Sequence, residues 1–191
     1  PIFFWYAITP AFTSGAFFSL STYATFLMRD QYGGTSGDYG LYFMLLTVGF
    51  MSGNYISGRV TNRVKTDFMV VAGCIIGIIT VELLAASVLF FPKSPLALFL
   101  PGALLGMAQG LALPYAQAAA INAEPNLTGT ASGIVMFLQF VAAATASLFI
   151  STLYDGTFFP LIEVIFFLSA LALCSAIFAN YAQKKRYKKN V

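Results

Sequence analysis

The feature that most constrains this chain is a succession of six long apolar segments joined by short polar loops. We place the segments at residues 3–28, 39–58, 68–91, 96–121, 127–153 and 158–182. A helix needs about 20 mostly apolar residues to cross the roughly 30 Å hydrocarbon core of a bilayer. Backbone groups in lipid must bond within their own segment, and strands of about ten alternating residues are absent. The sequence therefore predicts an all-α membrane protein with six transmembrane helices.

The composition leaves little room for a water-soluble domain. Hydrophobic residues make up 59% of the 191 residues and charged residues 9%, against about 25% charged residues in soluble domains. We therefore expect one transmembrane domain over residues 1–183, embedded in a lipid bilayer, and a basic tail over residues 184–191. Because the first apolar segment begins almost at Pro1, we also expect the chain to be a piece of a longer protein.

Several kinds of site lack the residues they require. The chain has no histidine, which removes a Ser-His-Asp triad, a Cys-His dyad and imidazole metal ligands. The two cysteines, Cys74 and Cys174, lie inside apolar segments and are expected to be free thiols. We predict no metal, no cofactor and no enzymatic activity. The basic tail is typical of a topology signal in a membrane protein rather than of a nucleic-acid-binding arm.

Basic residues in the loops predict the orientation. Eight lysines and arginines lie in the loop at 59–65 and in the tail, whereas the loops on the other side carry only Arg29 and Lys93. Loops rich in lysine and arginine stay in the cytoplasm. Both termini are therefore predicted to be cytoplasmic.

The fourth segment carries a glycine repeat and a proline. Gly102, Gly106 and Gly110 recur every four residues and share one helix face, which lets another helix approach closely. Pro114 removes a backbone donor within the segment. This combination suits a helix that changes conformation during a functional cycle, and packing alone is the alternative.

Polar side chains within the apolar segments are candidates for a substrate cavity. Buried amides and hydroxyls in lipid need partners, so these residues either bond between helices or line a cavity for amphipathic molecules. The candidates are Ser19, Thr22, Tyr23, Phe26, Asn54, Gln109, Tyr115, Gln117 and Gln139.

Two acidic residues lie within the apolar segments. Glu82 is near the middle of the third segment, where an ionisable group is costly and is a candidate for proton binding. A structural glutamate that is protonated or paired is the alternative. Glu163 lies near the start of the sixth segment and is expected to reach the membrane surface.

Arg59 and Arg63 lie one helical turn apart where the second segment ends. Cations favour a helix C-terminus, because they bond its last carbonyls and complement its dipole. The two arginines also suit a clasp on an acidic group of a neighbouring helix, which would hold one conformation. Anchoring the topology is the third interpretation.

The loop at 58–67 resembles a family signature. It is similar to the degenerate Gly-x-x-x-(Asp/Asn)-Arg-x-(Gly/basic) motif that the major facilitator superfamily carries after the second helix of each half. Asn62 and Val64 stand where the stronger N-terminal copy of this motif has aspartate and glycine. Residues 110–118 and 129–133 resemble the tenth and eleventh helices of Bcr/CflA-type drug exporters. Residues 32–43 resemble the entry to their eighth helix. The resemblance covers the whole chain as helices seven to twelve.

This resemblance implies half of a twelve-helix transporter, built from two inverted three-helix repeats over residues 1–95 and 96–191. It implies proton-coupled efflux of small amphipathic drugs by alternating access, in the manner of an antiporter that confers multidrug resistance. The cavity would be formed by the first, second, fourth and fifth segments, together with an N-terminal half or a second copy. The location implied is a bacterial inner membrane.

Two other functional classes remain open at this stage. A self-contained six-helix channel or scaffold is the main alternative, although the chain has no paired Asn-Pro-Ala loops and no selectivity-filter sequence. A membrane enzyme is the third candidate, and without histidine it has no obvious hydrolytic machinery.

Overall fold

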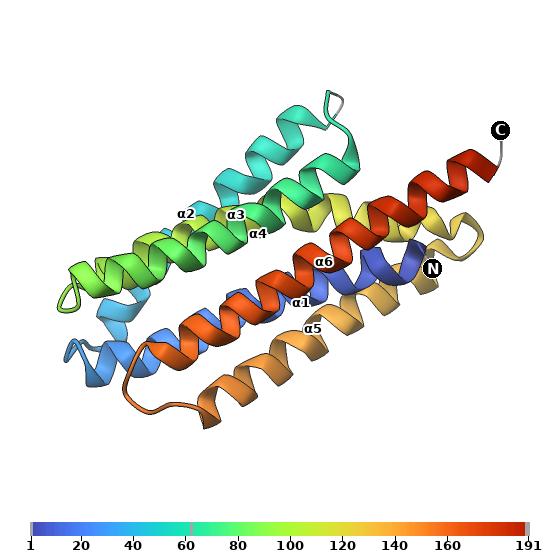
Figure 1. Cartoon of the computed structure of the whole chain (residues 1–191). Coiled ribbons are helices and arrows are strands. Elements are labelled where there is room, and N and C mark those ends of the chain that lie inside the picture. The colour runs from blue at the N-terminus through green and yellow to red at the C-terminus, as the bar shows by residue number, and fades with distance from the viewer. Residues whose placement is uncertain (1, 62, 190–191) are drawn as a thin grey trace.

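The computed structural model describes residues 2–61 and 63–189, and these fold into six long helices without any strand (Figure 1). The helices are α1 (Ile2–Asp30), α2 (Ser36–Val60), α3 (Thr66–Phe90), α4 (Leu96–Ala123), α5 (Thr128–Thr152) and α6 (Phe159–Lys189), with a short 3-10 turn, η1 (Pro125–Leu127), before α5. The predicted fold class, an all-α protein with six helices, is confirmed. The basic segment that we expected as a tail begins as a continuation of α6.

The six helices differ in how apolar they are. Within the described residues, α3, α4, α5 with its preceding turn, and α6 are long and apolar enough to cross a membrane. Helices α1 and α2 are as long but less uniformly apolar, because α1 carries seven serine and threonine residues and α2 carries five glycines. The hydroxyls of Thr9, Ser14 and Ser19 are buried, so these polar groups of α1 face protein.

Helices α1 and α4 form the centre of the bundle. Helix α1 packs against α5, α6 and α4, whereas α4 packs against α2, α3 and α1, and α3 meets α6. If α1, α2 and α3 are exchanged with α4, α5 and α6 respectively, the same pairs of helices remain in contact. That is the arrangement expected of two related three-helix repeats. Both chain termini lie at one end of the bundle (Figure 1), which we call the terminal end, and the opposite end is the loop end.

The closest helix approach is between α2 and α4. A Cβ atom added at Gly49 of α2 would lie 1.9 Å from the carbonyl oxygen of Ala103, and one added at Gly106 of α4 would lie 2.5 Å from that of Leu46. Gly53 and Gly110 have equally short separations. The two backbones therefore touch directly, which only glycine permits.

Three prolines interrupt helical hydrogen bonding: Pro10 in α1, and Pro101 and Pro114 in α4. A proline leaves the carbonyl four residues earlier without its usual donor. For Pro101 that carbonyl belongs to Ala97, and it accepts a hydrogen bond from the hydroxyl of Ser87 on α3. The neighbouring helix thus replaces the donor that the proline removes.

Candidate functional site

Two of the cavity candidates form a pair between α4 and α5. Nε2 of Gln117 donates a hydrogen bond to Oε1 of Gln139 over 2.7 Å. Gln117 is half-buried, and Gln139 is 9% exposed. The pair makes no other hydrogen bond within the described part of the chain, so each amide retains donors or acceptors for a ligand.

Four other candidates lie inside the helix packing. Gln109 donates to the hydroxyl of Ser14 on α1 over 2.9 Å, and Tyr115 donates to the carbonyl of Ser57 on α2 over 3.1 Å. Tyr23 donates to the carbonyl of Thr157 over 2.8 Å. The hydroxyl of Ser19 is buried and has no partner among the described residues. In this structure Gln109, Tyr115 and Tyr23 connect neighbouring elements, and none of the four side chains lines an open surface.

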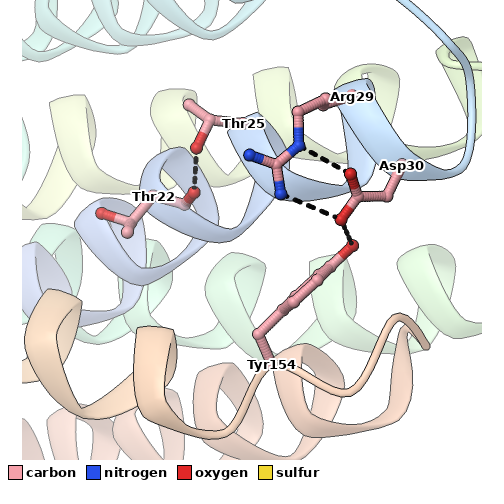
Figure 2. Close-up of polar contacts among 5 residues, drawn as sticks. All are labelled: Thr22, Thr25, Arg29, Asp30 and Tyr154. Atoms are coloured by element: carbon pink, nitrogen blue, oxygen red, sulfur yellow. Dashed lines mark hydrogen bonds and ion pairs between the residues drawn. The ribbon is translucent and has the colours of Figure 1, made fainter.

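The remaining three candidates are half-buried. Asn54 donates to the carbonyl of Phe50 in its own helix over 2.9 Å. The ring of Phe26 lies 5.1 Å from that of Tyr154. Thr22 lies one turn before Phe26 on α1, and its carbonyl accepts the hydroxyl of Thr25 over 2.6 Å (Figure 2). Thr22 and Phe26 therefore lie toward the loop end, away from the glutamine pair.

At the loop end, a polar cluster joins α1 to the α5–α6 loop (Figure 2). Arg29 forms an ion pair with Asp30 at 2.6 Å, and the hydroxyl of Tyr154 donates to Asp30 over 2.8 Å. These groups lie outside the membrane-spanning segments. The hydrogen bond from Arg29, and then that from Tyr154, hold the pKa of Asp30 below its usual range. Burial, with a smaller contribution from Asp30, raises the pKa of Tyr154 to about 12.

At the terminal end, a second polar cluster joins three helices. The hydroxyl of Tyr6 on α1 donates to the carboxylate of Asp67 on α3 and lies 2.7 Å from Oε1 of Gln183 on α6. No pattern in the sequence marks these three residues as a site. Tyr6 is one of many aromatic residues, and Asp67 is the last residue of the arginine loop.

The two loop arginines lie on α2 and just after it. The guanidinium of Arg59 lies 5.1 Å from the ring centre of Tyr55, which is a cation–π contact. Neither Arg59 nor Arg63 forms an ion pair with any described residue. The clasp on an acidic group is not formed in this conformation.

The acidic residues of the spans lie on the outer helices. Glu82 on α3 and Glu163 on α6 are exposed, and the neighbours of Glu82 on its face include the exposed Ile79 and Leu83. In contrast, the stretches 3–28, 39–58, 96–121 and 128–152 of α1, α2, α4 and α5 contain no charged residue at all. The structure therefore separates Glu82 from the cavity candidates.

The arrangement of two related three-helix repeats around a pair of central helices agrees with a comparison of the sequence with protein families. Residues 1–147 match the model of the Major Facilitator Superfamily. The chain belongs to this superfamily. No curated protein and no solved structure matches it significantly. Membership makes the chain an integral membrane protein of a transporter family rather than of an enzyme family.

Proposed function

We propose that this chain is the C-terminal half of a superfamily transporter of the Bcr/CflA type, which exports small amphipathic molecules in exchange for protons. The observation that carries the proposal is the uncharged amide pair of Gln117 and Gln139 between α4 and α5. Amides that keep hydrogen-bonding capacity within an apolar wall suit molecules that are mostly apolar and carry a few polar groups.

The lack of charge on α1, α2, α4 and α5 bears on the coupling mechanism. A proton carrier needs a titratable group that changes its environment during the cycle. Within this chain only Glu82 and Glu163 lie in the spans, and both face outward. We therefore assign proton coupling to the other half of the cavity, with Glu82 as a proton-binding residue only where a partner covers α3.

A second helix bundle is required to close the cavity. Helices α2 and α5 each pack mainly against one central helix, and each exposes a row of large apolar side chains. The rows include Leu41, Met44, Val48 and Met51 on α2, and Phe137, Phe140 and Val141 on α5. An N-terminal six-helix half or a second copy of the chain would cover part of these rows and face the glutamine pair.

The helix packing also supports alternating access. Gly106 and Gly110 contact the backbone of α2 directly, and Gly102 leaves room for the side chain of Leu46, so α2 and α4 form a unit that moves together. Pro114 and the two arginines lie nearer the terminal end, where such a unit would pivot. We propose that these residues control the conformational change.

The test is transport into proteoliposomes under a proton gradient, with the chain alone and with an N-terminal half supplied as a separate polypeptide. We expect flux of an amphipathic dye only with both halves present. The Gln139→Leu variant is expected to reduce that flux at least tenfold, whereas Thr145→Val, a change on the exposed face of the same helix, leaves it unchanged. Proton-driven flux by this chain alone would refute the half-transporter assignment.

A further inference from the structure

A cleft opens between α3 and α6 at the terminal end of the bundle. Its volume is about 790 Å³, and its walls include Lys65, Phe68, Val71, Asn180, Gln183 and Lys184. Two of its wall residues, Asp67 and Gln183, contact the hydroxyl of Tyr6. We propose that this cleft, which we call the lysine cleft, binds the headgroup and upper acyl chain of an anionic phospholipid.

The two lysines of the cleft have no acidic partner among the described residues. Lys65 and Lys184 are exposed, and neither makes an ion pair with any residue that the structure describes. Asp67, the acidic residue of the cleft, accepts the hydroxyl of Tyr6. Two ammonium groups at the mouth of one cleft therefore attract an anion from outside the protein.

The rest of the cleft matches a lipid rather than a free anion. Phe68 is 64% exposed and lies one turn from Lys65 toward the membrane, so an apolar wall begins directly beneath the charged rim. Lysines at the level of the headgroups, above exposed aromatic side chains, are the usual arrangement at a membrane surface. The cleft thus has positive charge at the position of a phosphodiester and an apolar wall along the acyl chain attached to it.

One buried atom in the cleft wall lacks a partner. Oδ1 of Asn180 is buried and makes no hydrogen bond within the described residues. Buried polar atoms are nearly always bonded, so this acceptor gives the wall of the cleft a polar character beside its apolar part.

The opposite end of α3 offers an internal comparison. There a groove of about 520 Å³ between α3 and α4 is lined by Leu83, Phe91, Leu100 and Leu104, and no charged residue lines it. Such a groove admits acyl chains of any lipid and does not distinguish headgroups. Selectivity for an anionic lipid is therefore expected only at the terminal end.

The test is native mass spectrometry of the purified chain after exchange into equimolar phosphatidylglycerol and phosphatidylcholine. We expect retention of one phosphatidylglycerol in preference to phosphatidylcholine. Each lysine near an anionic headgroup strengthens binding several-fold, so Lys65→Gln/Lys184→Gln is expected to weaken phosphatidylglycerol binding roughly thirtyfold. The control, Arg63→Gln/Lys185→Gln, removes two charges at the same end but outside the cleft and should change binding less than about twofold.

Two outcomes would overturn the inference. An equal loss in both double variants would mean that diffuse surface charge, and not the cleft, attracts the lipid. Equal retention of both lipids by the unaltered chain would mean that the cleft has no headgroup preference. Helical content by circular dichroism checks that each variant is folded, and lipid binding is read without any transport assay, so its failure is separate from that of the proposed function.

Discussion

Replacing Gly49 by alanine tests the direct contact between α2 and α4. The new Cβ would lie 1.9 Å from the carbonyl oxygen of Ala103, which is backbone and cannot rotate away. The helices must separate, and overpacking of this kind costs about 1–3 kcal/mol, beyond the 0.5–1 kcal/mol or so that alanine gains over glycine in a helix. For a chain of this length 1 kcal/mol corresponds to a shift in Tm of about 2–4 °C. We expect Tm to fall by about 2–12 °C.

The chain contains a reporter and matched controls for this experiment. The thiol of Cys74 is buried and Cys174 is exposed, so in a Cys174→Ala background a thiol-reactive dye reports the unfolding of α3. Gly133→Ala on α5, where a Cβ meets nothing within 4 Å, should be neutral or slightly stabilising. Gly77→Ala, where the nearest atom is 3.7 Å away, should also be neutral. A Gly49→Ala protein as stable as these two would refute the packing argument.

Two of the three further predictions concern single contacts, and the third concerns the orientation in the membrane. Ser87→Ala leaves the carbonyl of Ala97 on α4 without its donor, so the free energy of unfolding should fall by about 1 kcal/mol. The same thiol-reactive dye measures this change. Ser151→Ala, whose hydroxyl bonds within its own helix, should have little effect. Because its folded-state pKa is lowered, Asp30 stabilises the loop end above its unfolded-state pKa, and this contribution is lost as pH falls through the folded-state pKa. Tyr154→Phe should raise the pKa of Asp30 toward its ordinary value in an NMR titration, and an unchanged value would contradict the contact. If both termini are cytoplasmic, Lys93→Cys in a background without native cysteines should react with an impermeant maleimide from outside the cell, and Lys65→Cys should not.

The helices could be predicted from the sequence because apolar length alone determines them. Each predicted segment lies within a few residues of an observed helix, and the largest difference is at α6, where the basic residues continue the helix to Lys189. Charged residues at a helix end form a helix as readily as apolar ones, so the end of an apolar segment does not mark the end of the helix.

The partners of the polar residues could not be predicted. Gln117 and Gln139 were both candidates, but their pairing depends on how α4 and α5 cross, which neither segment encodes by itself. Tyr6 meets Gln183 across almost the whole chain, and hydroxyl–amide contacts leave no periodic signal. Gly49 and Gly53 were missed because their four-residue spacing lies in a helix rich in other small residues.

The helices of each three-helix repeat pack mainly against helices of the other repeat, and this has a consequence for biosynthesis. Helix α2 finds its principal partner in α4, and α1 finds its own in α5 and α6, whereas α1 and α2 barely touch. When α1, α2 and α3 have been synthesised and α4 to α6 have not, these three helices have few contacts to make with one another. Each three-helix repeat is therefore a unit of symmetry but not of folding, and its helices reach their final packing only after the helices of the second repeat have entered the membrane.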